Sequence, residues 1–317
     1  MWNRTTIDSR LLLRLGITRA RLASLTAVAT LVLAACANPV ATSAPAGEQL
    51  KVVATTTVFA DIVGAIGGDH VTVDSIVPAG SGPEDYEPRP DDARKLADAD
   101  LIVSNGVGLD DFLADIIDAV GSATAERLVL GEGIPTITVN GEENPHFWLD
   151  PTLVEQHYVP AIQETLSRLL PEARSDIEAA ADDYTAMLRE LDEASRTKLA
   201  AIPPERRKLV TFHDAFPYFA DHFDFELVGV ILENPGQEPS AADLAALVRT
   251  VKEAGVTAVF SEAQFDPKLA RTLADEAGIT RVVTTLYNDS LGPPPADSYV
   301  GLMTWDVDEI VKALSTP

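Results

Sequence analysis

A long segment without glycine or proline lies in the middle of the chain and limits the folds that the chain can adopt. The segment 172–201 is rich in Ala, Leu, Glu and Arg, and prolines flank it at 171 and 203. These residue types favour the α-helix, whereas proline is tolerated only at its first turn or beyond its end. Such a helix would be about 45 Å long at ~1.5 Å per residue. The composition predicts one continuous helix, with two shorter helices separated near Thr197 as the alternative.

On both sides of this helix, short apolar runs alternate with amphipathic segments. Before it, we predict strands at 51–56, 71–77 and 101–104, helices at 58–67, 91–97 and 109–120, one or two short strands within 127–139 and a helix at 154–170. After it, we predict strands at 208–212, 225–231, 257–261 and 281–286, helices at 215–222, 241–254 and 268–277, and a final helix. Such alternation is typical of parallel sheets covered by helices. The predicted fold is therefore α/β: two α/β lobes, each a mainly parallel sheet with flanking helices, joined by one long rigid helix. Their bounds would be 51–170 and 203–317, with the linking helix at 171–202.

The start of the chain has a different character. Five arginines precede an uncharged apolar run at 22–35, and the sequence at 33–36 is Leu-Ala-Ala-Cys. A basic start, a short apolar run and small residues predict a secretory signal peptide at 1–35. Residues 33–36 resemble the lipobox of bacterial lipoproteins, in which Cys36 carries the lipid; a cleaved signal with a chance cysteine is the alternative. Residues 36–50 would then hold this cysteine and a flexible tether rich in Ala, Pro and Ser.

The charge of the chain argues against nucleic acid as a partner. The formal net charge is −25, whereas proteins that bind nucleic acid need Lys and Arg for its phosphates. The same charge opposes adsorption to anionic lipid. We therefore expect contact with a membrane through a lipid on Cys36 and not through surface charge.

One imidazole lies in an unusually stiff loop. The stretch NPHFWLDP at 144–151 places His146 between two prolines and beside two aromatic residues. Proline restricts the backbone, and a neutral histidine offers a lone pair to a metal. A packed loop histidine with an ordinary hydrogen bond is the alternative.

Further polar residues follow predicted strands. Glu84 and Asp85 come after the second strand, His213 one residue after the strand 208–212, and Asp289 after the strand 281–286. Ligands of open α/β sheets bind beyond the carboxyl ends of strands. With His146, these residues would meet in a cleft between the lobes, a common place for a small-ligand site.

Each of these residues also has an ordinary structural interpretation. Glu84 and Asp85 can be solvated surface charges, His213 can belong to a helix start capped by Asp214, and Asp289 can form a turn. The remaining histidines look like surface or helix-face residues and are assigned no role: His70, His157 and His222.

Several motifs in order resemble one family across residues 50–315. They are GPEDYEP, SNGVGLDDFL, NPHFWLDP, VTFHDAFPYFA, VFSEAQFDPK and NDSLG. The chain is similar to the substrate-binding lipoproteins of ABC transporters for zinc and manganese. The resemblance implies two α/β lobes joined by one long helix and a metal held between them.

The resemblance also implies four metal ligands, of which three match directly. They are His146, His213 and Asp289, whereas Glu84 stands where the family usually has a histidine. In the alternative, Glu84 points away and water or Asp85 completes the site. Two imidazoles and two carboxylates suit Zn²⁺ or Mn²⁺, and Zn²⁺ binds most such sites more tightly. No histidine-rich loop precedes His146, and the donor set leaves the choice of metal open.

The predicted function is capture of a divalent metal, Zn or Mn, outside the membrane and delivery to an ABC transporter permease. We expect a monomer that is anchored to the bacterial cell membrane and is not an enzyme. Two alternatives remain: an adhesin or structural lipoprotein with a vestigial site, and a metal-dependent hydrolase with Glu262 as the base. The hydrolase is disfavoured because four protein ligands would leave no open coordination position.

Overall fold

The computed structural model describes residues 49–84, 86–120, 125–232 and 239–315. The predicted signal peptide, the lipid-bearing Cys36 and nearly all of the tether lie outside these residues, as does Asp85. None of the helices in the described ranges is long and apolar enough to cross a membrane.

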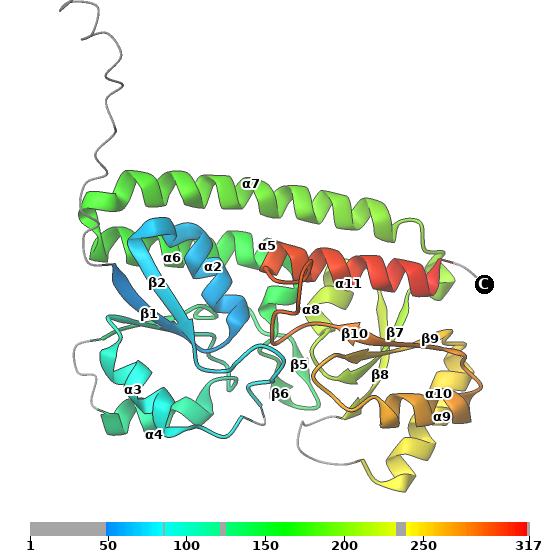
Figure 1. Ribbon diagram of the computed structural model, residues 1–317. Helices are drawn as coiled ribbons and strands as arrows, with labels where there is room; N and C mark the ends of the chain where they lie inside the picture. The colour runs from blue at the N-terminus through cyan, green and yellow to red at the C-terminus, as the bar shows by residue number, and fades with distance from the viewer. Residues whose placement is uncertain (1–48, 85, 121–124, 233–238, 316–317) are drawn as a thin grey trace, which may run out of the picture. The chain divides into compact units, whose positions relative to one another are not determined.

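The first half is built on a four-stranded parallel sheet (Figure 1). Its strands, in the spatial order β2-β1-β3-β4, are β1 Leu50–Ala54, β2 Val71–Ser75, β3 Leu101–Ser104 and β4 Glu126–Val129. Helices α2 Thr57–Gly67, α3 Pro90–Asp98 and α4 Asp111–Val120 cover it. Successive side chains of a strand face opposite sides, so Val52 and Ala54 pack with α2 whereas Val53 packs with α3 and α4.

The second half contains two parallel strand pairs. β7 Lys208–His213 pairs with β8 Glu226–Leu232, and β9 Ala258–Glu262 pairs with β10 Arg281–Leu286. β7 lies next to β9, so the two pairs form one layer. The helices of this half are α8 Pro217–His222, α9 Ala241–Ala254, α10 Lys268–Ala277 and α11 Tyr299–Leu314. The predicted α/β class with parallel strands in both halves is confirmed.

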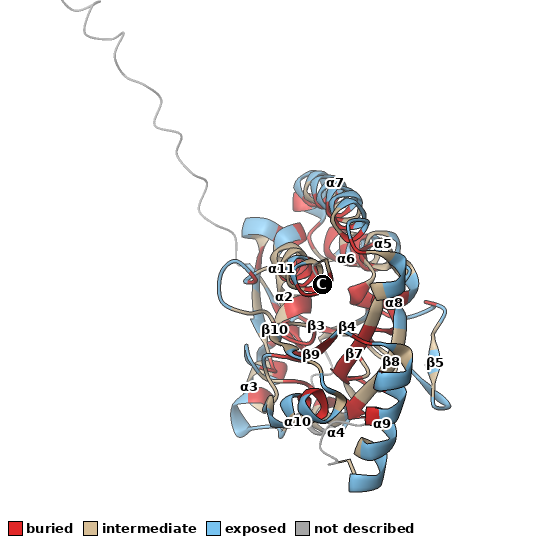
Figure 2. Ribbon diagram, turned by 90° about the vertical axis from the view of Figure 1, so that its right-hand side faces the viewer, coloured by how far each residue is buried: buried red, intermediate tan, exposed pale blue. Residues whose placement is uncertain are grey.

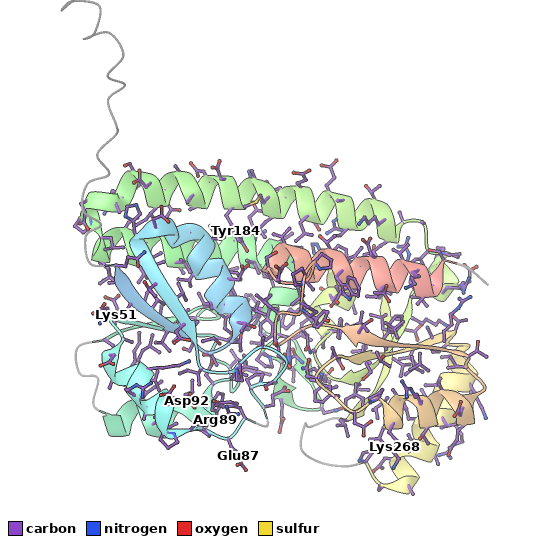
Figure 3. All side chains as sticks on the ribbon, viewed as in Figure 1. Lys51, Glu87, Arg89, Asp92, Tyr184 and Lys268 are labelled. Atoms are coloured by element: carbon purple, nitrogen blue, oxygen red, sulfur yellow. The ribbon has the colours of Figure 1, made fainter. Side chains whose placement is uncertain are left out.

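The central segment forms one helix, α7 Arg174–Leu199, after a 3-10 turn at Pro171–Ala173. One continuous helix is therefore confirmed, and the alternative of two helices is wrong. Its buried residues recur every three or four positions and make one stripe: Ile177, Ala181, Tyr184, Leu188, Leu191, Ser195 and Leu199. The stripe faces α2 and α6 Val159–Leu169 of the first half and α11 of the second, with Tyr184 on the α2 side (Figure 3). The opposite face is exposed (Figure 2).

The two halves share the largest hydrophobic cluster of the described residues, and each half also has a smaller cluster of its own. The shared core contains Phe59 and Trp148 of the first half, Ile177 of α7, and Phe216 and Tyr299 of the second half. Separating the halves widely would expose this core, and burial of apolar surface is the main stabilising contribution in folding. The halves are therefore expected to stay together when a ligand enters or leaves.

Two local predictions are confirmed, and the structure adds detail to each. The predicted helix at 154–170 is a short α5 Pro151–Leu153, a π-helical turn Val154–Tyr158 and then α6 Val159–Leu169. Pro160 lacks the N–H that a regular α-helix would need at that position. Within 127–139, strand β5 Thr138–Val139 pairs with an unpredicted β6 Glu142–Glu143. Asn-Gly at 140–141 makes this hairpin turn, with φ of 52° and 90°.

Candidate metal centre

Four side chains from the two halves meet at the carboxyl ends of the strands. Glu84 lies in the loop after β2, and His146 precedes the 3-10 turn Phe147–Leu149. His213 is the last residue of β7, not the residue after the strand as predicted, and Asp289 follows β10. One ligand-type atom of each residue lies within 4.8 Å of the others. The structure thus brings together the four residues that sequence reasoning selected.

The spacing of these atoms matches the size of a metal ion. Nε2 of His146 is 3.7 Å from Oε1 of Glu84 and 3.5 Å from Oδ1 of Asp289. Nε2 of His213 is 3.7 Å from Oε2 of Glu84 and 3.6 Å from Oδ2 of Asp289. Ligand atoms at about 2.0–2.2 Å from a tetrahedral ion stand about 3.3–3.6 Å apart. A set of one ligand atom from each residue spans up to 4.8 Å, so an ion would draw the four groups closer together.

His146 is held by the loop that carries it. Oδ1 of Asn144 is 3.0 Å from its Nδ1 and accepts its backbone N–H at 3.1 Å, and Nδ2 of Asn144 donates to the carbonyl of Asp214 at 2.6 Å. The ring of Trp148 lies 5.1 Å from the imidazole. Nε2 of His146 is buried and has no hydrogen-bond partner among the described residues, so it is available as a ligand. Burial lowers the pKa of His146 to about 3.

His213 is equally buried but has carboxylate neighbours. Its Nδ1 is 3.2 Å from Oε1 of Glu262, whose side chain is 0% exposed. Burial lowers the pKa of His213, but the charges of Glu84, Glu262 and Asp289 outweigh it and raise the pKa to about 10. Nδ2 of Asn288 lies 3.1 Å from Nε2 of His213.

Glu84 closes the site from a loop. The residue as a whole is exposed, but its side chain turns inward and is only 21% exposed. The alternative in which Glu84 points away is therefore wrong for this structure. Burial raises the pKa of Glu84, and His213 partly offsets this shift. The carboxylate lines a cavity of about 270 Å³ that also contains His146 and His213.

Asp289 is the most completely buried of the four residues, with a side chain that is 0% exposed. Its Oδ2 accepts a hydrogen bond from Nε2 of Gln264 at 2.9 Å, and its backbone N–H donates to Oδ1 of Asn288 at 2.6 Å. The indole N–H of Trp148 donates to the carbonyl of Asn288 at 2.8 Å, which joins the two halves beside the site. Sequence reasoning missed Asn144, Gln264 and Asn288, although all three lie inside the quoted motifs.

The charge of the site favours a cation. Glu84, Glu262 and Asp289 bring three carboxyl groups together with His146 and His213 in a region that is largely removed from water. Buried carboxylates are costly unless a positive charge compensates them. Imidazole nitrogen together with carboxylate oxygen suits a divalent transition metal.

His222 was wrongly described as a surface or helix-face residue. Its side chain is 8% exposed and lies between two acids, with Nδ1 3.2 Å from Asp150 and Nε2 2.6 Å from Asp192. Burial lowers its pKa, but the hydrogen bonds with Asp150 and Asp192 outweigh this and raise it. His70 is at the surface, as predicted, with a side chain that is 38% exposed.

The fold has two α/β halves that share one long helix. Between them lies a group of histidines and acids spaced for an ion. Together these features define the class of two-lobed solute-binding proteins. The sequence model of one family, described as "Zinc-uptake complex component A periplasmic", matches residues 52–313. The chain therefore belongs to this family of ABC transporter substrate-binding proteins, which confirms the resemblance.

Individual relatives agree with this assignment. The metal ABC transporter substrate-binding lipoprotein SloC of Streptococcus mutans is 30% identical and covers 85% of this chain and 92% of its own length. The manganese ABC transporter substrate-binding lipoprotein PsaA of Streptococcus mitis is 30% identical, over 91% of this chain and 96% of its own length. Among solved structures, the periplasmic zinc-binding protein TroA of Treponema pallidum is 30% identical with a TM-score of 0.78, covering 84% of this chain and 100% of TroA.

Proposed function

We propose that this chain captures a divalent transition metal outside the membrane and delivers it to the permease of an ABC transporter. One observation carries the proposal: the buried Nε2 of His146 has no hydrogen-bond partner among the described residues and faces carboxylate oxygens of Glu84 and Asp289 at 3.7 and 3.5 Å. A buried polar atom in this position needs an explanation, and a bound ion supplies one.

The proposed ligands are Glu84, His146, His213 and Asp289. Two carboxylates would neutralise a divalent ion, and two imidazoles would supply nitrogen. This donor set accepts both Zn²⁺ and Mn²⁺, and by the general order of affinities Zn²⁺ binds more tightly. The relatives include one named for manganese and one named for zinc, so the metal is left to measurement.

The location follows from the N-terminal sequence and from the relatives. Two of the relatives are named as lipoproteins, and Leu-Ala-Ala-Cys at 33–36 resembles the lipobox of bacterial lipoproteins. We propose that Cys36 carries the lipid anchor and that the chain works as a monomer on the outer side of the bacterial cell membrane.

Binding is better supported than catalysis. In the hydrolase alternative Glu262 would act on water at the ion, but Oε1 of Glu262 lies 3.2 Å from Nδ1 of His213, the nitrogen on the far side of the ring from Glu84 and Asp289. Four protein ligands also leave no open position for a substrate. The adhesin alternative assumes a site that has lost metal binding. The acids and imidazoles are still spaced for an ion, which argues against that alternative.

Release of the ion would involve the Glu84 loop. This loop is attached at one end by the hydroxyl of Tyr86 and the backbone N–H of Arg89, which donate hydrogen bonds to Asp92 of α3 at 2.8 and 2.7 Å. Figure 3 labels Arg89 and Asp92 next to each other. Near its other end, the N–H of Gly80 donates to Oγ of Ser290 at 2.6 Å. Because the halves share one core, movement of this loop opens the site at lower cost than separation of the halves. Hydrogen exchange should change in the loop and not in α7.

Metal loading tests the proposed function. The purified chain is freed of metal, titrated with Zn²⁺ and with Mn²⁺, and followed by thermal unfolding. A specific ion present at one hundred times its dissociation constant should stabilise the fold by about 2.7 kcal/mol. A stabilisation that disappears in His146→Ala supports the site, and the ion with the larger effect identifies the metal. No stabilisation by any divalent ion would overturn the proposal.

A further inference from the structure

Glu262 is a buried acid that lies beside His213, on the side of the ring away from the proposed ion. It is the last residue of β9, next to β7, and its side chain is 0% exposed. Its Oε1 lies 3.2 Å from Nδ1 of His213, whereas the ion-sized cluster uses Nε2 of that ring. Glu262 therefore lies behind the histidine and would not contact the proposed ion.

The geometry points to Glu262 as a positioning residue for metal capture, which acts through His213 by orienting and polarising its ring. This inference rests on the proposed function. An Nδ1–H that donates to a carboxylate leaves the Nε2 lone pair free for the ion and fixes the plane of the ring. It also makes the imidazole a stronger donor, because negative charge behind the ring increases its basicity.

The surroundings of the ring support this role. Phe265 packs against the imidazole with ring centres 5.2 Å apart, and Phe265 stacks on Phe212 at 4.6 Å. These contacts restrict rotation of the His213 imidazole ring, so only a few ring orientations are available next to Glu262. The remaining choice is which nitrogen carries the proton, and a carboxylate next to Nδ1 determines that choice.

His146 provides an internal reference. Its Nδ1 faces the neutral amide oxygen of Asn144 at 3.0 Å instead of a carboxylate. Both partners can accept an Nδ1–H, but only Glu262 brings a negative charge. The two histidines are thus oriented in the same way by partners of different charge, and the charge behind His213 should increase affinity beyond what orientation gives.

The test compares Glu262→Gln with Asp306→Asn as a matched control. Asp306 of α11 is another fully buried acid of the same half, and its Oδ1 accepts the N–H of Tyr287 at 3.0 Å. Burial raises the pKa of Asp306 well above its usual value, which favours the neutral form, so an amide should replace it with little change. Zn²⁺ affinity is measured by competition with a chelator of known affinity.

Glu262→Gln should weaken Zn²⁺ binding about 10- to 100-fold, the usual effect of losing a partner behind a ligand. Asp306→Asn should bind as the wild type does. Equal affinity of Glu262→Gln and the wild type would overturn the inference while leaving the proposed function intact. A wild type that binds no divalent ion would instead overturn the proposed function.

A second measurement uses the wild type and does not depend on how the variant folds. Loaded with ¹¹³Cd²⁺, the protein should show ¹¹³Cd–¹⁵N coupling to Nε2 of both histidines and a proton on Nδ1 of His213 that exchanges slowly with water. Coupling to Nδ1 of His213 would contradict the positioning role, because that nitrogen would then hold the ion and not face Glu262.

Discussion

His146 and His213 reach the same site from different halves of the molecule, and both are fully buried, yet their charges differ. His146 faces the amide of Asn144, and its pKa is lowered to about 3. His213 faces the carboxylate of Glu262, and its pKa is raised to about 10. Burial acts in the same direction on both rings, since it disfavours the charged imidazolium. The carboxylates raise the pKa of His213 more than that of His146, and the charge of His213 lowers the pKa of His146 further.

The metal-free site balances its charge through this difference between the two histidines. At neutral pH, His213 carries a positive charge among the acids Glu84, Glu262 and Asp289, whereas His146 is neutral. An arriving divalent ion would take over the role of that imidazolium. The site is thus held near its bound geometry before the ion arrives, with Nε2–oxygen distances of 3.5–3.7 Å.

The largest expected effect is on metal affinity and stability when each histidine is replaced by alanine. His146→Ala and His213→Ala should each weaken metal binding by more than the ~100-fold typical of an outer partner. In the metal-free protein, His213→Ala should also lower the free energy of unfolding by about 3–5 kcal/mol, because Glu262 is left buried and unpaired. His146→Ala should lower it less, because Asn144 is neutral. Chemical denaturation of both variants measures this, and equal losses would contradict the comparison.

A third histidine shows whether carboxylates raise a histidine pKa away from the metal. His222 lies between Asp150 and Asp192, and its pKa is raised. His222→Gln should cost about 1.5–3 kcal/mol of stability, as for hydrogen bonds to charged groups. Since the folded pKa exceeds the unfolded value of about 6.5, the loss should be full below that pH and should shrink as pH rises through the folded pKa.

Urea denaturation between pH 5 and 9 measures the contribution of His222. The control is His70→Gln, since His70 meets Asp176 at 3.1 Å with side chains that are 38% and 69% exposed, and exposed pairs contribute about 0–1 kcal/mol. A cost for His222→Gln that grows with pH would show that the histidine is stabilised in its neutral form.

Metal binding should release a proton from His213 and none from His146. With a pKa of about 10, His213 must lose one proton before Nε2 can bind the ion. Between pH 6 and 8 the affinity should therefore rise about tenfold per pH unit, which is ~1.4 kcal/mol. Calorimetry in two buffers with different protonation enthalpies counts the protons. If no proton is released, His213 is already neutral in the metal-free protein, and the two histidines do not differ in charge.

The smallest expected effect concerns the exposed corner of the site. Glu84→His would supply a third imidazole in the position where the resemblance implies one. The preference for Zn²⁺ over Mn²⁺ should rise by on the order of a few-fold, because imidazole suits Zn²⁺ better than Mn²⁺. Parallel titrations with both ions measure the ratio, with Glu87→His in the same loop as the control. An unchanged ratio would show that Glu84 does not set the choice of metal.

Local signals were enough for several elements of the fold. The predicted bounds of α9, α10 and β10 agree with the structure. Ser240 caps the start of α9, and Gly255 and Gly278 end α9 and α10 in the left-handed conformation. Caps and glycines act over a few residues, and for that reason the sequence reveals them. The order of motifs likewise identified the residues that could form the site.

Other features depend on partners that are distant in the chain. The resemblance implies that Glu84 stands where the family usually has a histidine, but only the folded loop shows that its carboxylate turns toward His146 and His213. The role of His222 depends on Asp150 and Asp192, which reach it from other elements. Hydrophobic periodicity says which face of an element is buried, not which charged groups meet there.

The sequence by itself determined the alternation of strands and helices, the continuous α7 and the residue types available for metal binding. Those properties follow from periodicity, from the absence of helix breakers and from local caps. Only the tertiary structure decided that Glu262 stands behind His213 while Asn144 stands behind His146. A pKa depends on burial and on charges a few ångströms away, and only the fold brings those charges together.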